Sequence, residues 1–337
     1  MRGGCYNDER NRREGLTVTE TTQTVLETYQ IRKTRRQKTA FIDYVQSVSA
    51  ADGYECKTEK GYLGARNIVV GNPDTAKVIY TAHYDTCAVM PFPNFITPKC
   101  IWIYLLYQIL ITVVLLAVPT LILAGIGGIG LLLSPYLTIG LMVGFGLTFC
   151  LWYFFLLLEM YLLLAGPANK HTANDNTSGV TTLLDIMTAL PAELRGEVAF
   201  VFFDLEEMGL LGSAGFASKH RRIAKGTLLL NSDCVSDGHT LLFALREGAK
   251  RYEHAISGAF PSTETHTVEV VSRGVFYPSD QANFFRGVGV AALKGRGRLL
   301  YMDRIHTKRD TVYMEENIAY LTEGAVRLAG SLINKQS

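Results

Sequence analysis

Short apolar runs that end at polar residues recur along the chain. Three such runs are Val78–Ala82, Val198–Phe203 and Thr227–Leu230. Continuous apolar runs of this length are typical of strands buried on both faces. Helical patterns lie between them, at Gly179–Leu190 and Ser213–His220. Because strands alternate with helices, the pattern predicts an α/β sheet that is covered on both sides.

The region before the first strand has a different spacing of apolar residues. Val25, Phe41 and Val45 belong to a helical pattern that predicts one helix over residues 18–50. A basic run, from Arg32 to Lys38, lies within this segment. It is either a solvated helix face or a contact with anionic lipid headgroups. Residues 1–17 are polar and charged, and we expect a flexible tail without an apolar leader.

A long apolar insert interrupts the pattern of short strands and helices. From Ile101 to Ala168 the only charged residue is Glu159. A helix needs about 20 apolar residues to cross a membrane. The glycines between 125 and 130, with Pro135, divide the insert into Ile101–Leu123 and Tyr136–Leu164. We therefore predict a two-helix transmembrane hairpin over residues 101–165; the alternative is a buried hairpin of a soluble protein.

The flanks of the insert indicate its orientation. Lys99 precedes it and Lys170 follows it, so the positive-inside rule predicts two passes with the catalytic domain in the cytoplasm. Glu159 lies alone in the second predicted helix, and an ionisable residue inside a membrane suggests a functional residue. The alternative for Glu159 is a position near the cytoplasmic end, in reach of water.

Charge and cysteine content exclude some classes of protein. The 337 residues include 33 Lys and Arg against 31 Asp and Glu, a net charge of +2. This balance argues against an acidic disordered chain and against a surface built for nucleic acid. The six cysteines form no Cys-x-x-Cys pair, which favours reduced thiols over a disulfide framework.

Candidate metal ligands follow the predicted strands. They are His83, Asp85, Asp175, Glu206, Glu207, Asp233 and His306. In open α/β sheets, ligands bind beyond the carboxyl ends of the strands. Two histidines with several carboxylates suit zinc, manganese or cobalt better than copper(I) or an iron–sulfur cluster. Because uncompensated carboxylates repel one another in one cleft, the set favours a bound cation.

Five motifs in a fixed order carry a family resemblance. They are His-x-Asp (His83, Asp85), Asn-Asp-Asn-x-Ser-Gly (Asn174–Gly179), Glu-Glu-x-Gly-Leu-x-Gly-Ser (Glu206–Ser213), Ser-Asp (Ser232, Asp233) and His-Thr-x-x-Asp-Thr (His306–Thr311). The chain resembles the co-catalytic zinc exopeptidases of the aminopeptidase S and aminopeptidase Y type. The resemblance implies a mixed, mostly parallel sheet flanked by helices. It also implies a catalytic domain split into residues 18–100 and 166–337 around the hairpin.

The resemblance further implies two divalent metal ions, zinc first, with manganese or cobalt as alternatives. Asp175 would bridge the two ions. His83 and Asp233 would complete one site, and Glu207 and His306 the other. The insert lies between His83 and Asp175 in the sequence, so both of its ends belong on the same side of a membrane.

Two further roles come from the same resemblance. Asp85 would accept the remaining ring N–H of His83, and Glu206 would be the general base. A cis peptide bond is expected after Asp175. Successive residues of a regular strand point to opposite faces, so Glu206 and Glu207 can share a site only if the backbone leaves strand geometry there.

One departure concerns the substrate side of the site. Family members commonly have Ser-Asp-His where this chain has Ser279-Asp280-Gln281. The missing histidine is not an expected metal ligand, so the departure affects specificity. Tyr277 could donate a hydrogen bond to an oxyanion or contact substrate, or it could be a packed aromatic residue.

The sequence thus predicts a membrane-anchored di-metal hydrolase of amide bonds. An aminopeptidase acting on apolar peptides is the first interpretation, and an amidase or deacylase of N-acyl lipids or lipopeptides is the second. A glutaminyl-cyclase-like transferase is a third, although that family typically uses one zinc. A non-catalytic scaffold of the same fold is the alternative from another class. The expected partners are a peptide or lipid-linked amide substrate and membrane lipids, with no nucleic acid; a homo-oligomer stays open.

Overall fold

The computed structural model describes residues 19–133 and 138–334, and gives the backbone alone between residues 126 and 148. The predicted tail (residues 1–17) and the predicted turn at Pro135 lie outside the described residues. The chain forms two compact units. One contains the residues up to Cys100 together with Ala168 onward, and the other is Ile101–Pro167.

A nine-stranded sheet forms the centre of the larger unit, in the order β1-β2-β4-β3-β5-β8-β6-β7, with β9 paired to β8. The strands are β1 (Cys56–Lys60), β2 (Arg66–Val70), β3 (Val78–His83), β4 (Val198–Phe203), β5 (Leu228–Ser232), β6 (Thr240–Leu245), β7 (Thr267–Val271), β8 (Gly287–Arg296) and β9 (Leu299–Tyr301). The central strands β4, β3, β5 and β8 run parallel, whereas β1 and β2 pair antiparallel with their neighbours. Strand β6 pairs antiparallel with β8 and parallel with β7. The predicted α/β fold is confirmed.

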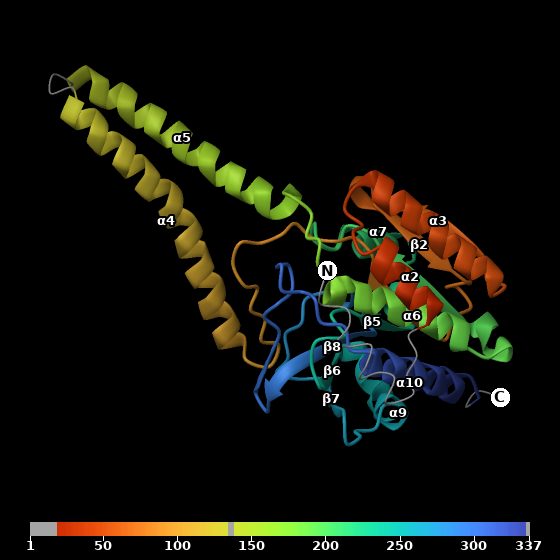
Figure 1. Cartoon of the computed structure of the whole chain (residues 1–337). Helices are drawn as coiled ribbons and strands as arrows, with labels where there is room; N and C mark the ends of the chain where they lie inside the picture. Colours follow the sequence, from red (N-terminus) through yellow and green to blue (C-terminus); the bar gives the residue numbers. More distant parts are fainter. Residues whose placement is uncertain (1–18, 134–137, 335–337) are drawn as a thin grey trace. The chain divides into compact units, whose positions relative to one another are not determined.

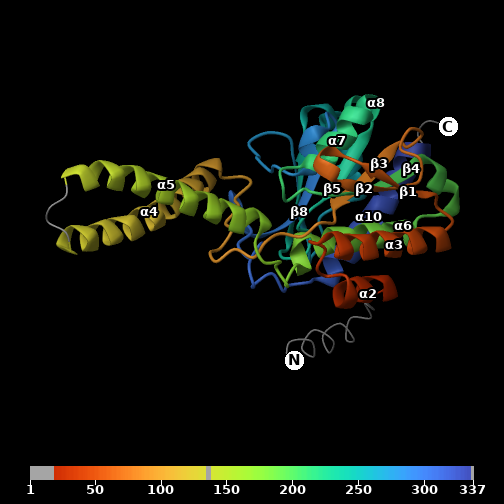
Figure 2. The same ribbon diagram turned by 90° about the horizontal axis from the view of Figure 1, so that it is seen from above.

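Helices cover both faces of this sheet. They are α2 (Glu20–Thr28), α3 (Arg35–Ala51), α6 (Gly179–Ala189), α7 (Leu211–Lys219), α8 (Arg221–Gly226), α9 (Glu253–Ala259) and α10 (Glu315–Asn334). Figure 2 shows α7 and α8 on one face and α3, α6 and α10 on the other. Alternate residues of β3 serve the two layers, because Tyr80 packs in the α6–α10 core while Ile79 packs in the α7–α8 core. The three predicted strands are therefore buried on both faces.

The predicted single helix over residues 18–50 is wrong, since α2 and α3 are separate helices. A capping box begins α3: Thr34 Oγ1 accepts the N–H of Gln37, and Gln37 Oε1 accepts the N–H of Thr34 at 2.8 Å. The break lets Arg32 enter the core, where its side chain is fully buried. Its Nε donates to the Tyr84 carbonyl and its guanidinium also donates to Thr177 Oγ1 at 3.2 Å. Two loops near the sheet edge are thereby tied together.

The burial of two residues in the basic run decides whether those residues can contact lipid headgroups. Arg32 is 0% exposed and Lys38 is 6% exposed. Lys38 forms an ion pair with Asp204, whose carboxylate also accepts the N–H of Arg66 at 2.9 Å. These two members of the basic run are therefore held inside the larger unit and cannot contact lipid headgroups.

The smaller unit contains α4 (Ile101–Leu133) and α5 (Thr138–Ala165) (Figure 1). Trp152 Nε1 donates to Thr120 Oγ1 at 3.2 Å between the two helices. Within the described residues, Ile101–Gly125 is long and apolar enough to cross a membrane, whereas Phe149–Ala165, the part of α5 whose side chains the structure describes, is shorter. Large apolar side chains such as Leu121 are exposed along α4. One candidate span is thus present, and the second pass stays a prediction.

Candidate metal centre

The carboxyl ends of the parallel strands meet at one edge of the sheet and bring the predicted residues together. His83 is the last residue of β3, and Asp233 directly follows β5. Glu206 and Glu207 follow β4, and Asp175 lies in the turn before α6. All of these side chains converge with His306, which comes from the loop after β9. Residues more than two hundred positions apart therefore form one cluster.

Asp175 is the centre of this cluster, because its two carboxylate oxygens face different histidines. Its Oδ1 lies 3.2 Å from His83 Nε2, and its Oδ2 lies 2.9 Å from His306 Nε2. His83 Nε2 also lies 3.4 Å from Asp233 Oδ1, and His306 Nε2 lies 3.2 Å from Glu207 Oε2. The arrangement thus has two halves that share one carboxylate.

The donor set fits divalent cations. Potential ligand atoms of His83, Asp175 and Asp233 lie within 4.8 Å of one another, and so do those of His83, Glu206 and Glu207. Glu207 Oε1 is buried and has no hydrogen-bond partner among the described residues. A buried polar atom without a partner costs free energy, which a cation bound at this position would recover. Imidazole and carboxylate are ligands that suit zinc.

The Asn-Asp-Asn motif builds the turn that carries Asp175. Asn174 Oδ1 accepts the N–H groups of Ser236 and Asp237, at 2.8 and 3.0 Å. Asn176 Nδ2 donates to the carbonyl of Ser232 at 3.0 Å. The two asparagines therefore satisfy buried backbone groups of the segment after β5, and this fixes the turn between them. The peptide bond between Asp175 and Asn176 is cis, as the resemblance implies.

The two glutamates share the site because the backbone leaves strand geometry after β4. Leu205 has a φ of +56°, and the chain turns there. The Asp85 carboxylate accepts the N–H of Glu206 at 3.0 Å and that of Glu207 at 3.3 Å. His83 Nδ1 lies 3.1 Å from the Asp85 backbone carbonyl but 3.7 Å from its carboxylate. The main-chain carbonyl of Asp85 is thus closer to His83 Nδ1 than its carboxylate is, and the expected role of the Asp85 side chain stays a prediction.

Burial and the crowding of carboxylates together set the electrostatics of the site. Burial raises the pKa of Glu206 well above its usual value, and the charges of Asp233, Glu207 and Asp280 add to this, against the opposing effect of His83. Burial lowers the pKa of His83, but nearby carboxylates outweigh it and raise that pKa well above the ordinary value. Glu206 and His83 therefore both hold their protons more strongly than usual.

Asp280 belongs to the same surroundings, and sequence reasoning missed it as a site residue. It is fully buried, and burial raises its pKa to about 7. Neither of its carboxylate oxygens accepts a hydrogen bond within the part of the chain that the structure describes. Asp280 belongs to Ser279-Asp280-Gln281, the segment that differs from the Ser-Asp-His of the resembled family, and this position could have identified it as a site residue.

The remaining predicted residues lie as follows. Tyr277 Oη donates to the backbone carbonyl of Asp233 at 3.0 Å, so the hydroxyl already has a partner. Gln281 Nε2 donates to the Tyr277 carbonyl at 2.6 Å, and its Oε1 accepts from Asn231 at 3.1 Å. Gln281, which stands where the resembled family has a histidine, therefore fixes the backbone of Tyr277. Glu159 lies in α5, in the other unit.

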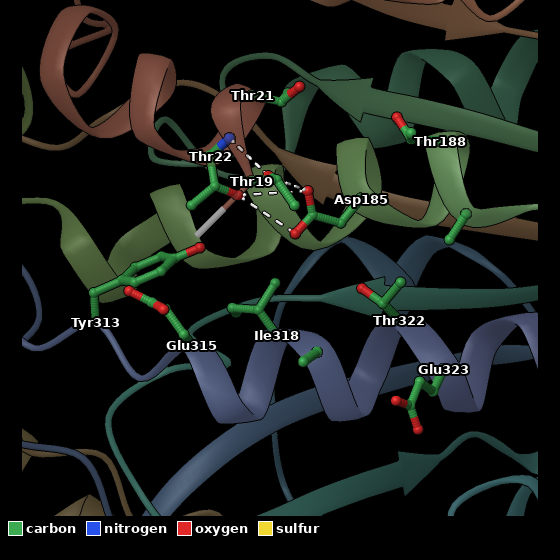
Figure 3. Close-up of a pocket in the computed structure, with 12 residues that line it drawn as sticks. Thr19, Thr21, Thr22, Asp185, Thr188, Tyr313, Glu315, Ile318, Thr322 and Glu323 are labelled. Atoms are coloured by element: carbon green, nitrogen blue, oxygen red, sulfur yellow. Dashed lines mark hydrogen bonds between the residues drawn. The ribbon is translucent and has the colours of Figure 1, made fainter. Parts of the chain in front are cut away.

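A separate cavity of about 340 Å³ lies between α2, α6 and α10 (Figure 3). Asp185 lines this cavity and accepts hydrogen bonds from Thr19 Oγ1 at 2.8 Å and Thr22 Oγ1 at 3.4 Å. Burial raises the pKa of Asp185 to about 6, and the two hydroxyls offset part of this effect. None of the predicted metal ligands lines this cavity.

Known structures share this fold. The LapA aminopeptidase of Legionella pneumophila is 12% identical, with a TM-score of 0.55 over 97% of this chain and 75% of that one. A glutaminyl cyclase of Porphyromonas gingivalis is 15% identical, with a TM-score of 0.56 over 94% of this chain and 96% of that one. A Zn-dependent exopeptidase from Parabacteroides distasonis is 14% identical, with a TM-score of 0.55 over 93% and 95% of the two chains. No curated protein matches the chain.

The convergent histidines and carboxylates, on a fold shared with zinc exopeptidases, support a metallo-exopeptidase. Residues 161–325 match the model of Peptidase family M28. This part of the chain is therefore similar to Peptidase family M28. His83 and Asp85 lie before the matched residues, and the strand order brings them to the same site. Because aminopeptidases and glutaminyl cyclases share the fold, the fold alone does not distinguish their reactions.

Proposed function

We propose that the protein is a membrane-anchored aminopeptidase that uses two divalent metal ions to remove N-terminal residues from apolar peptides. The bridging position of Asp175 carries this proposal, since each of its oxygens faces a separate histidine. His83, Asp175 and Asp233 would hold one ion, and Asp175, Glu207 and His306 the other. Zinc suits these donors best, and manganese or cobalt could replace it.

The chain's own residues account for the proton transfers. Bound cations would supply the Lewis acidity that polarises a substrate carbonyl and makes water a nucleophile at neutral pH. Glu206 would accept the proton of the attacking water on its carboxylate and deliver it to the leaving amine. Asp85 positions Glu206 through the backbone N–H. The buried surroundings of Glu206 favour its protonated form once it has accepted the proton.

Membrane anchoring is proposed from the apolar insert. Ile101–Gly125 is long and apolar enough for one pass, and Phe149–Ala165 continues the apolar pattern. His83 and Asp175 serve one site, so the chain must return to the side from which it enters the insert. Two passes meet this condition, and Lys99 and Lys170 favour a cytoplasmic catalytic unit. The insert is the reason to expect apolar substrates.

The general-base role can be tested with full-length protein in detergent, reconstituted with zinc. Glu206→Gln should retain two metal ions per chain but lose turnover of an aminoacyl arylamide by about 100-fold or more. Glu193→Gln, an exposed glutamate in the same unit, should behave like the parent. A Glu206→Gln protein with normal metal content and turnover would contradict the proposed mechanism.

The substrate class can be tested on the same preparations. A panel of an aminoacyl amide, an N-acyl lipid amide and an N-terminal glutaminyl peptide separates the alternatives. Hydrolysis of the first supports an aminopeptidase, whereas hydrolysis of the lipid amide alone supports the amidase or deacylase. Cyclisation of the glutaminyl peptide supports a cyclase, and no turnover with metal bound would support a scaffold. A version with Ile101–Ala165 replaced by a short linker should lose activity on apolar substrates selectively.

A further inference from the structure

A cysteine lies beside one half of the candidate metal centre. Cys87 follows His83 by four residues and is 4% exposed. Potential ligand atoms of Cys87, Glu207 and His306 all lie within 4.8 Å of one another. The spacing of cysteines along the sequence predicts no such role, because the partners of this thiol come from two other segments. The tertiary structure adds a sulfur donor to a set of nitrogen and oxygen donors.

A second observation points to a ligand at this position. The Glu207 side chain is 10% exposed, and its Oε2 lies 3.2 Å from His306 Nε2. Its Oε1 is buried and has no hydrogen-bond partner among the residues that the structure describes. The Cys87 thiol and the His306 imidazole thus lie near a buried carboxylate that has one unpartnered oxygen. Such a group of donors is expected around a cation.

The backbone holds Cys87 in place relative to His306. The Cys87 carbonyl accepts the N–H of Asn169 at 3.1 Å, and Ala88 forms a β-bridge with Ala168. The Asn169 side chain donates to the carbonyl of Thr307, the residue after His306, at 3.0 Å. Asn169 therefore links the loop of the thiol to the loop of the imidazole. Their proximity follows from this fixed backbone arrangement.

We propose that Cys87 is a further metal ligand at the Glu207–His306 half of the centre. This inference rests on the proposed di-metal function. On coordination the thiol would lose its proton to solvent, and the sulfur lone pair would form the bond to the cation. Asp175, Glu207, His306 and Cys87 would then provide four protein ligands, which is the number typical of closed, firmly held zinc sites.

The two halves of the centre would differ in consequence. The half formed by His83, Asp175 and Asp233 would offer three protein ligands, the number that catalytic zinc sites use. The half that includes Cys87 would favour thiophilic ions, such as zinc and cadmium, over manganese. Cys87 would thus determine which metal the protein selects and which half of the centre is open.

Cobalt spectroscopy tests the sulfur bond directly. Full-length protein in detergent, loaded with Co²⁺ to two ions per chain, should show a sulfur-to-cobalt charge-transfer band in the near ultraviolet. Cys87→Ser should lose the band. Cys56→Ser should keep it, because Cys56 lies in β1 and belongs to none of the described metal-ligand groups. Cys234→Ser is a second control, because this buried thiol contacts Asp233 at 3.2 Å but belongs to no such group either.

Metal competition gives an independent measurement. Cys87→Ala should lower the preference for Zn²⁺ over Mn²⁺ by about tenfold or more, because a thiolate ligand favours zinc over the harder manganese ion. Thermal denaturation of the metal-free variants would show whether they fold like the parent. A protein that binds two ions and hydrolyses aminoacyl amides, yet shows no cobalt–sulfur band, would overturn the role of Cys87 alone. A protein that binds fewer than two ions would overturn the proposed di-metal function first.

Discussion

The Asp310 carboxylate accepts the backbone N–H of Asp175 at 2.9 Å, and its other oxygen accepts the N–H of Asn174 at 2.8 Å. The last motif in the chain therefore orients the turn that carries the central carboxylate. His306 and Asp310 belong to that same motif, and His306 contacts the Asp175 side chain directly. One short segment thus positions Asp175 by both its backbone and its side chain.

Replacement of Asp310 should weaken metal binding without removing a ligand. In Asp310→Ala, two buried N–H groups lose their acceptor and the turn at Asp175 becomes less well fixed. We expect about a 10- to 100-fold loss of metal affinity, with Asp310→Asn intermediate. Isothermal titration of the metal-free protein with Zn²⁺ measures this. Asp303→Ala is the matched control, because Asp303 pairs with Lys294 and Arg309 instead. Equal affinities of the Asp310 and Asp303 variants would contradict the positioning role.

Replacement of Lys38 should destabilise the catalytic unit. Lys38→Met leaves the buried Asp204 carboxylate without its cationic partner, and breaking a buried pair in this way costs about 3–5 kcal/mol. Arg36→Met, which changes an exposed member of the same basic run, should be close to neutral. Thermal unfolding of the two variants in the same detergent measures the difference. A Lys38→Met protein as stable as Arg36→Met would show that Asp204 does not depend on the pair.

Asp185, in the cavity of Figure 3, should make stability depend on pH. Its pKa in the folded protein is raised to about 6 by burial, above the ordinary value of 3.8. The folded state therefore favours the protonated carboxyl, so stability is greatest at low pH and falls as pH rises from about 4 through 6. The difference corresponds to about 3 kcal/mol at neutral pH.

Asp185→Asn should remove this dependence, because an amide oxygen can still accept from Thr19 and Thr22 but does not ionise. The Tm of the variant relative to the parent should therefore increase between pH 4 and pH 7. The exposed Asp74→Asn serves as control, since Asp74 lies at the surface. A constant difference in Tm across this range would mean that Asp185 titrates normally.

Charges introduced into α4 should release the protein from membranes. Leu110 and Val114 are exposed apolar residues of α4. An arginine at the centre of a spanning helix costs about 2.5–3.5 kcal/mol, so the double change to arginine should reduce integration strongly. Alkaline carbonate washing of membranes, followed by immunoblotting, measures the retained fraction. Leu63→Arg, at an exposed position of the catalytic unit, should stay with the membrane like the parent. If the double variant were retained equally, α4 would not be the anchor.

Local patterns predicted most of the architecture. The buried strands β3, β4 and β5 follow from continuous apolar runs, because a strand covered on both faces needs apolar side chains on both. The helix over residues 18–50 was wrong for a local reason that could have been recognised. Thr34 and Gln37 form a capping box, and this signal starts a new helix within an otherwise helical pattern.

The order of motifs and the position of the apolar insert were determined by the sequence itself. The order of the motifs can be recognised from residue types alone, and the apolar insert can be recognised from its composition alone. The tertiary structure decided which side chains meet. It buried Arg32 and Lys38, turned the Asp85 carboxylate toward the Glu206 and Glu207 backbone, and placed Cys87 beside His306. These contacts join segments that lie far apart in the chain, so the local spacing of apolar residues cannot predict them. They arise only when parallel strands bring their ends to one edge of the sheet.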